Sequence, residues 1–238
     1  MYKPILSMLV WLLPATCILC GSLTRNTQNI CHTCQQDLPI LPHGCQQCAD
    51  FLLSSATNDN LKCGNCLKNP PAYDKTYALF PYKPPINHLI TKLKFNHQLS
   101  HARALGELMT NRIQSLWYVN KPLPDLIIPI PLHPLRLRER GFNQAIEIAR
   151  PIAKALAIPI DFHGVTRIKH TRAQSGLPAK ERKCNLTQAF SLSRNYSNLT
   201  VAVIDDVITT GHTVMECCRM IKDHGAKRID VWCCARNG

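Results

Sequence analysis

Two adjacent carboxylates lie near the end of the chain, directly after an apolar segment. Residues 200–204 are mostly β-branched, which favours a strand, and Asp205 and Asp206 follow them. Residues 209–213 (Thr-Thr-Gly-His-Thr) then lead into a helical pattern. Ligands of open α/β sheets bind at the carboxyl ends of the strands, where these residues lie. The hydroxyls, backbone N–H groups and helix N-terminus that residues 209–213 provide suit a phosphate. The pattern indicates a sugar 5-phosphate whose diol reaches the acids. The alternative is two acids in a solvated turn.

Cysteines are the second group of residues whose spacing indicates chemistry. Eight of the 13 form four Cys-x-x-Cys pairs, with 10, 10 and 14 residues between successive pairs: Cys17/Cys20, Cys31/Cys34, Cys45/Cys48 and Cys63/Cys66. This spacing lets two thiolates converge on one tetrahedral ion, and two such pairs complete a four-sulfur zinc site. We therefore expect two structural zinc ions and a reducing compartment rather than disulfides. Residues 16–40 and 41–68 would each hold one ion if the pairs combine in chain order, but the spacing also allows interleaved pairing.

The elements that must position these residues follow from the hydrophobic pattern. Strand patterns cover residues 76–82, 125–131, 200–204 and 228–235, and helical patterns cover residues 86–95, 100–117, 143–156 and 213–224. This alternation predicts an α/β fold with a mostly parallel sheet and helices on both faces. Residues 164–185 are polar, basic and aperiodic, which is typical of a functional loop. A change of composition at residues 69–71 predicts a zinc-binding domain over 1–70 and an α/β domain over 71–238.

Composition limits the class of partner. Of 238 residues, 45% are hydrophobic and 18% charged, which excludes a disordered chain, and the net charge of +13 favours a polyanionic ligand such as a phosphate or a nucleic acid. Residues 5–13 form an apolar run that resembles a secretion signal. Nine residues are too few to span a bilayer, so we expect a short helix packed on the zinc-binding domain and a protein that is not transmembrane.

The segment at residues 201–213 resembles the phosphoribosyl pyrophosphate (PRPP) motif of type I phosphoribosyltransferases at every diagnostic position. The resemblance implies a type I phosphoribosyltransferase-like fold and PRPP bound together with magnesium. Asp205 and Asp206 would hold the ribose hydroxyls. The residues that would bind the 5-phosphate are Thr209, Thr210, Gly211, His212 and Thr213.

Two further segments, residues 129–144 and 167–185, are similar to the ComF competence-protein family, as is the cysteine-rich module that precedes them. The resemblance extends from about residue 12 to residue 236. It does not separate the DNA-uptake branch from a sister, GntX-like branch named after gluconate metabolism.

The family pattern also implies roles for basic residues. Arg138 and Arg140 would act in catalysis with the two acids, in the loop that follows the strand at residues 125–131. Pyrophosphate and lid contacts would come from Arg136, Gly141, Arg167, Thr171, Gln174, Arg182 and Asn185. The alternatives for the arginine loop are a solvated basic helix start or a patch that binds DNA phosphates. The alternative for the lid is a grip on single-stranded DNA. Residues 76–100 are the best candidate for a hood over the acceptor, with aromatic side chains at Tyr77, Phe80, Tyr82 and Phe95.

Three classes of function fit these observations. The first is a magnesium-dependent phosphoribosyltransferase with an unknown acceptor. The second is a protein that binds PRPP and single-stranded DNA during DNA uptake, on the cytoplasmic side or peripherally at the inner membrane. The third is a zinc-ribbon adaptor with a relic site, which docks a membrane DNA-uptake channel or a helicase. The three are not mutually exclusive: we expect the second, and we expect phosphoribosyltransferase activity on an unknown acceptor rather than none.

Overall fold

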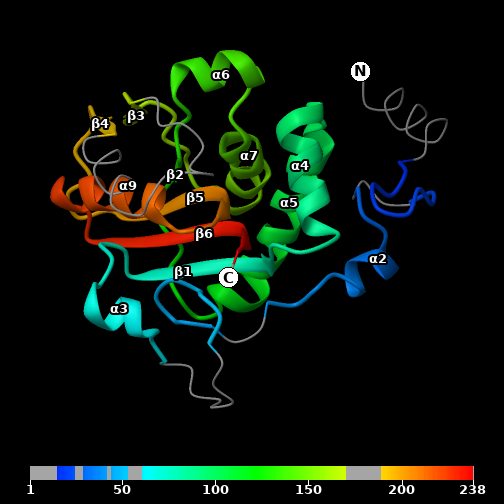
Figure 1. Ribbon diagram of the computed structural model, residues 1–238, viewed down its shortest axis with the longest axis horizontal. Coiled ribbons are helices and arrows are strands. Elements are labelled where there is room, and N and C mark those ends of the chain that lie inside the picture. Colours follow the sequence, from blue (N-terminus) through cyan, green and yellow to red (C-terminus); the bar gives the residue numbers. More distant parts are fainter. Residues whose placement is uncertain (1–14, 25–28, 42–43, 53–60, 170–188, 238) are drawn as a thin grey trace.

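The computed structural model describes residues 15–24, 29–41, 44–52, 61–169 and 189–237. The apolar run at residues 5–13 and the lid residues from 171 to 185 lie outside them. The larger domain contains a parallel sheet in the order β1-β6-β5-β2 (Figure 1). Its strands are β1 (Lys75–Pro81), β6 (Arg228–Arg236), β5 (Thr200–Ile208) and β2 (Leu126–Pro129). The predicted parallel α/β fold is therefore confirmed.

Helices cover both faces of this sheet because alternate strand residues point to opposite sides. Ala202 and Ile204 of β5 belong to the core formed with α4, α5 and α7, whereas Val201 and Val203 belong to the core formed with α9 (Figure 1). The bounds of these helices are α4 (Ile86–Asn96), α5 (Leu99–Arg112), α7 (Gln144–Leu156) and α9 (His212–Asp223).

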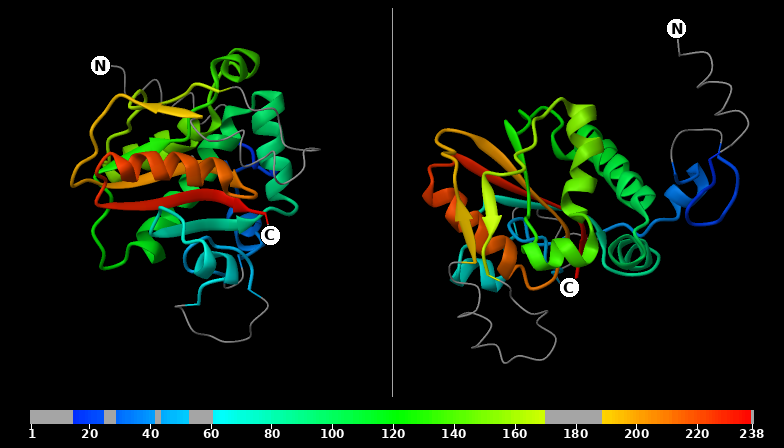
Figure 2. Two further views of the ribbon diagram at one scale, coloured as in Figure 1. Left: turned by 60° about the vertical axis from the view of Figure 1, so that its left-hand side comes forward. Right: turned by 90° about the horizontal axis from the view of Figure 1, so that it is seen from above.

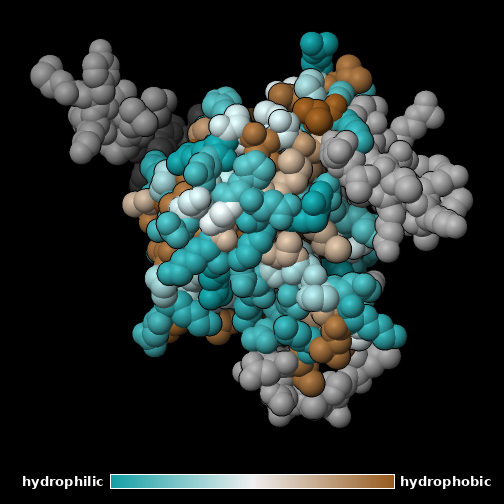
Figure 3. Space-filling view, turned by 90° about the vertical axis from the view of Figure 1, so that its left-hand side faces the viewer, coloured by the Kyte–Doolittle hydropathy of each residue, from teal (hydrophilic) through white to brown (hydrophobic). Residues whose placement is uncertain are grey.

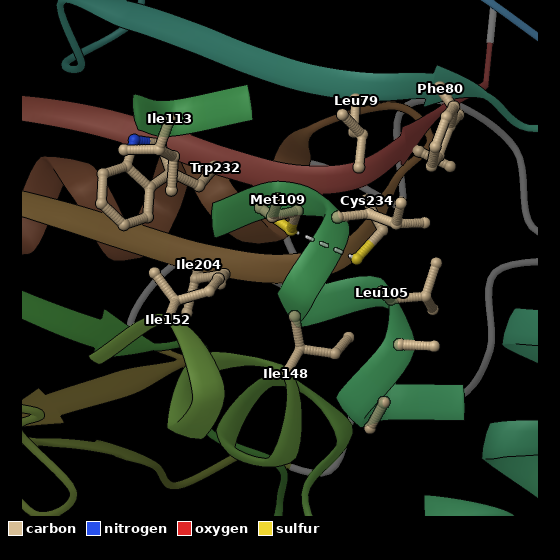
Figure 4. Packing of buried hydrophobic residues seen from close by; sticks show 14 of the residues in the cluster. Leu79, Phe80, Leu105, Met109, Ile113, Ile148, Ile152, Ile204, Trp232 and Cys234 are labelled. Atoms are coloured by element: carbon tan, nitrogen blue, oxygen red, sulfur yellow. Dashed lines mark hydrogen bonds between the residues drawn. The ribbon is translucent and has the colours of Figure 1, made fainter. Parts of the chain in front are cut away.

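The core beneath α5 and α7 is closely packed (Figure 4). Gly106 of α5 lies against α7, and a Cβ at this position would be 2.4 Å from Pro151 Cγ. The absence of a side chain thus lets the two helices approach. Cys234 donates to the sulfur of Met109 at 3.4 Å across this core. The four cysteines of α9 and β6, which lack metal-binding spacing, are all buried: Cys217, Cys218, Cys233 and Cys234.

A buried polar network closes the same core near the start of β6. The predicted helix over residues 100–117 ends as an α-helix at Arg112 and continues as the π-helical turn η1 (Ile113–Trp117). The Tyr118 hydroxyl follows this turn, donates to Asp230 at 2.6 Å and accepts from the Trp232 indole N–H at 3.2 Å. Tyr118 therefore satisfies the polar atoms of two fully buried side chains of β6.

The two cysteine-rich segments pack against different parts of this domain (Figures 1 and 2). The first, with α2 (His32–Gln36), places Ile30 and Leu38 in the core shared with α4 and α5. The second, with α3 (Gly64–Lys68), lies below β1 and places Ala49 in the core on the α9 side. Each cysteine-rich segment thus contributes side chains to the core on one face of the sheet.

In the described part of the larger domain, three elements were not expected from the sequence. Residues 134–140, predicted as a loop, form the short helix α6 (Pro134–Arg140). The strands β3 (Val165–Arg167) and β4 (Phe190–Leu192) form an antiparallel pair, and residues 168–189 connect them in the sequence. Hydrophilic residues cover most of the face that Figure 3 shows. Among the described residues, no helix combines the length and the hydrophobicity that crossing a membrane requires.

Candidate functional site

The acidic pair lies within strand β5, which is longer than expected. Pairing with β6 continues as far as Ile208 opposite Arg236, so Asp205 and Asp206 belong to the strand and not to the turn after it. Asp206 is buried on the side of α4 and α7, and Asp205 is partly exposed. Burial and the neighbouring charge of Asp206 raise the pKa of Asp205 to about 8, although the charge of Lys94 opposes this rise. One acid of the pair thus tends to keep its proton.

The turn after β5 has the geometry of a phosphate-binding loop. Gly211 has φ +76° and directly precedes the first residue of α9, so the backbone N–H groups at the start of this helix face the turn. Arg236 supports the turn from behind, because its guanidinium donates to the carbonyls of Ile208 and Thr209. All five residues predicted for the 5-phosphate line one cavity of about 280 Å³: Thr209, Thr210, Gly211, His212 and Thr213.

Basic side chains form the opposite wall of this cavity. Arg136 and Arg140 reach it from α6, and Arg167 reaches it from β3. Burial lowers the pKa of Arg167, and Asp205 partly offsets the effect. Gly141 ends α6 with φ +75° and reverses the chain toward α7. Arg138, which we expected to act in catalysis, is exposed on α6 and does not line the cavity.

Lys94 is a site residue that the sequence did not indicate. It extends from α4 into the cavity, and its Nζ lies 2.5 Å from the Oδ2 atom of Asp206. Burial alone would lower the pKa of Lys94, but the attraction of Asp206 outweighs it and raises the pKa. A single lysine beside the apolar stripe of a helix usually indicates a solvated residue, so only the packing of α4 beside β5 reveals this contact.

A short network connects the acids to the arginine wall. Gln144, at the start of α7, donates to Asp206 Oδ1 at 3.5 Å and accepts from Arg140 at 2.5 Å. Asp205 and Asp206 line an adjoining cavity of about 280 Å³. Carboxylate oxygens beside an open polar cavity are ligands that magnesium accepts, so these residues fit a magnesium ion that accompanies a phosphate ligand.

The candidate hood residues divide into two groups. Tyr77 and Phe80 are buried in the core, so they are unavailable to an acceptor, and this part of the expectation is wrong. The reason is that both lie on β1, which is covered on both faces. Tyr82 is partly exposed and lines the cavity that contains both acids, and Phe95 is exposed at the end of α4. The predicted lid residues lie outside the described residues: Thr171, Gln174, Arg182 and Asn185.

The eight paired cysteines form two clusters in chain order. One cluster contains Cys17, Cys20, Cys31 and Cys34, the other contains Cys45, Cys48, Cys63 and Cys66, and the sulfurs of each lie within 4.8 Å of one another. Four sulfurs at such distances fit one tetrahedral zinc ion. This arrangement decides between the two pairing patterns that the spacing allowed.

Backbone amides support the sulfurs in the same way in both clusters. The N–H of Cys31 points to the sulfur of Cys17 at 3.4 Å, and the N–H of Cys63 points to the sulfur of Cys45 at 3.2 Å. Such donors stabilise the negative charge of thiolate ligands. The two clusters therefore share the same set of four sulfurs and the same kind of amide donor, and both fit a zinc ion.

Two known domains account for these features. The sequence model of the double zinc ribbon domain matches residues 8–67, and that of the phosphoribosyl transferase domain matches residues 143–238. Together with the parallel sheet and the two four-cysteine clusters, these matches define the class: a phosphoribosyltransferase-type domain preceded by a double zinc ribbon.

Relatives that cover most of the chain identify the family. Competence protein F of Haemophilus influenzae is 37% identical over 92% of this chain and 96% of its own length. DNA utilization protein YhgH of Escherichia coli K12 is 34% identical over 94% and 97%, respectively. Competence protein ComFC of Bacillus subtilis is more distant, with 22% identity over 88% and 89%. The chain belongs to this competence protein F family, as the resemblance of its motifs implied.

Proposed function

We propose that this protein binds PRPP with magnesium in the cavity at the end of β5. The observation that supports this most is the convergence of three kinds of group on one cavity: the acid Asp205, the loop at residues 209–213 and the cations of the opposite wall. PRPP carries a diol, a 5-phosphate and a pyrophosphate, so each kind of group has a counterpart on this ligand.

The residues would divide the work by their positions. The loop ahead of α9 binds the 5-phosphate through backbone N–H groups and hydroxyls. Asp205 and Asp206 accept hydrogen bonds from the ribose hydroxyls, and Arg136 and Arg140 bind the pyrophosphate through their planar guanidinium groups. Magnesium, when bound, would neutralise part of the pyrophosphate charge. Transfer of the phosphoribosyl group to an acceptor would further require a nucleophile held beside the ribose. Tyr82 lines the cavity that contains both acids, so it is the residue that we expect to contact the acceptor.

Calorimetry on the zinc-loaded full-length chain tests this assignment. PRPP, ribose 5-phosphate and inorganic pyrophosphate are titrated separately in the presence of magnesium. We expect PRPP to bind at least about tenfold more tightly than either fragment, because it engages the loop and the arginine wall together. Equal affinities for PRPP and pyrophosphate would indicate a general anion site and contradict the proposal.

We further propose that single-stranded DNA is a second ligand. The ring of Phe95 is 66% exposed, and the guanidinium of Arg140 lies 5.8 Å from its centre. His97 and Phe142 form an edge-to-face pair at 5.8 Å, and Phe142 lies two residues after Arg140 in the chain. Exposed aromatic rings beside cations are typical of surfaces on which bases stack. The net charge of +13 adds attraction for the DNA backbone.

Fluorescence anisotropy with a labelled single-stranded oligonucleotide tests the second ligand. We expect the affinity to fall steeply with salt. Phe95→Ala should weaken binding by roughly 1–3 kcal/mol, the usual contribution of one stacked base. Phe162→Ala is the matched control, because Phe162 is also exposed and contacts an arginine. Its partner Arg150 does not line the cavity, whereas Arg140, the partner of Phe95, does. Equal affinities of the two variants would contradict the proposed stacking surface.

The names of the relatives suggest where these activities are used. The related proteins are called competence protein F, competence protein ComFC and DNA utilization protein. We infer that this protein serves DNA uptake from the cytoplasmic side, where PRPP is available. A membrane DNA-uptake channel or a helicase would then be its partner.

A further inference from the structure

The ion pair between Lys94 and Asp206 is largely buried and yet lies beside the cavity that contains both acids. The Asp206 side chain is 3% exposed and that of Lys94 is 22% exposed, and both lie beside the cavity. A buried ion pair contributes little net stability, because removing two charges from water offsets most of their attraction. The pair is therefore poorly explained as a stabilising contact and is better explained by what it does to the acidic pair.

Asp206 has partners on both oxygens before any ligand arrives. Lys94 Nζ occupies the Oδ2 side at 2.5 Å, and the Gln144 amide approaches Oδ1 at 3.5 Å. A divalent cation or a ribose hydroxyl that approached Oδ2 would meet the ammonium group first. Arg140 adds positive charge near the Oδ1 side, where its guanidinium donates to the Gln144 amide oxygen.

A bound phosphate ligand would offer Lys94 alternative partners. Lys94 lines the same cavity as Arg136 and Arg140, the residues assigned to the pyrophosphate. An ammonium group released from Asp206 would therefore find phosphate oxygens within the cavity once a ligand is bound. The lysine stem can turn between the two positions because its rotatable bonds allow it.

We propose that Lys94 is the resident counter-ion of the acidic pair, which excludes free divalent cations from the empty site and turns to the phosphates of the ligand when ribose hydroxyls reach Asp206. Metal then enters only together with the sugar phosphate. This inference rests on the proposed PRPP site for its second half, whereas the exclusion of free metal concerns the ligand-free protein alone.

Manganese binding in the absence of PRPP tests the exclusion directly. Free Mn²⁺ is measured by electron paramagnetic resonance on the zinc-loaded full-length chain, for the wild type, Lys94→Met and Lys92→Met. Lys92 is exposed on the same helix, so its variant matches the loss of charge without touching the site. We expect Lys94→Met to bind Mn²⁺ at least about tenfold more tightly than the other two proteins.

Equal Mn²⁺ affinities of the three proteins, or tight binding by the wild type, would overturn the proposal. If Lys94→Met does not fold, Lys94→Gln replaces it, since a neutral amide still donates to Asp206. The second half is tested with PRPP and ribose 5-phosphate, and Lys94→Met should weaken PRPP binding more than ribose 5-phosphate binding. A wild type that binds neither ligand would refute the proposed function, while the manganese comparison would still decide the role of Lys94.

Discussion

Arg236 joins the second cysteine cluster to the loop at residues 209–213, which we propose binds the 5-phosphate. Its Nη2 atom lies 3.5 Å from Asp50 Oδ1, and Asp50 follows Cys48 by two residues. The same guanidinium donates to the carbonyls of Ile208 and Thr209. A cavity of about 280 Å³ between these parts is lined by Cys48, Asp50 and Thr210, among others. The shape of the loop therefore depends on residues of both domains.

Arg236→Gln should disturb the loop and the fold together. Arg236 is 6% exposed, so the variant leaves buried carbonyls without donors, at a cost of about 1–3 kcal/mol in the free energy of unfolding. We also expect weaker binding of ribose 5-phosphate. Arg219→Gln, an exposed change on α9, is the control and should alter neither quantity. Urea unfolding and calorimetry provide both readouts, and unchanged binding by Arg236→Gln would contradict the link.

Metal analysis should find two zinc ions per chain, one for each four-cysteine cluster. Cys31→Ser and Cys63→Ser should each reduce the content to one ion, because each removes a ligand from a different cluster. Of the two, only Cys63→Ser should also weaken ribose 5-phosphate binding, since its cluster adjoins Asp50. Loss of both ions from either single variant would mean that the clusters are not independent.

The affinity for PRPP should rise with pH. The pKa of Asp205 is raised to about 8 by burial and by Asp206, so the free protein holds a proton there at neutral pH. Ribose hydroxyls and magnesium favour the carboxylate, so binding releases that proton, and this contribution to the affinity levels off above about pH 8. The raised pKa also affects stability. The free energy of unfolding of the ligand-free protein falls as pH rises from the ordinary pKa of Asp205 to about 8, because over this range the unfolded chain has lost the proton that the folded protein still holds.

Calorimetry in buffers of different ionisation enthalpy measures this proton release at neutral pH. Asp205→Asn should retain only the titration of the ligand phosphates. Identical proton release by the wild type and by Asp205→Asn would assign the whole pH dependence to the ligand and contradict the raised pKa.

Gly211→Ala isolates the backbone requirement of the loop at residues 209–213. A Cβ at Gly211 would meet only Ile208 Cγ2, at an ordinary 3.7 Å, so the cost comes from φ +76° and not from a clash. We expect a loss of about 1–2 kcal/mol in the free energy of unfolding and weaker phosphate binding. Gly64→Ala, in open space at the start of α3, should be neutral or slightly stabilising. Urea unfolding compares the two, and equal effects would contradict the strain argument.

The sequence predicted the main strands of the sheet and the turn that leads into α9, because strongly apolar strands and a glycine-containing turn are local signals. The end of β5 was placed too early, at residue 204, since the acids interrupt its apolar pattern although the pairing with β6 continues to Ile208. Helix α6 was missed because its arginines face solvent and the cavity, and none of its residues is buried.

The remaining parts of the site depend on tertiary structure. Lys94 reaches Asp206 from α4, 112 positions earlier in the chain, and no local pattern marks that contact. The contact of Asp50 with Arg236 likewise joins two domains. The order of zinc pairing also required the structure, because identical spacings make every combination of pairs chemically equivalent.

The central claim is that the acids of β5 and the loop after them bind PRPP, and one comparison tests it most directly. PRPP with magnesium is titrated by calorimetry into the wild type, Asp205→Asn/Asp206→Asn and Asp223→Asn, all loaded with zinc. Asp223 lies at the exposed end of α9, so its variant controls for the loss of negative charge. We predict binding by the wild type and the control and at least about a hundredfold loss in the double variant. Undiminished binding by a folded double variant, or no binding by the wild type, would contradict the account.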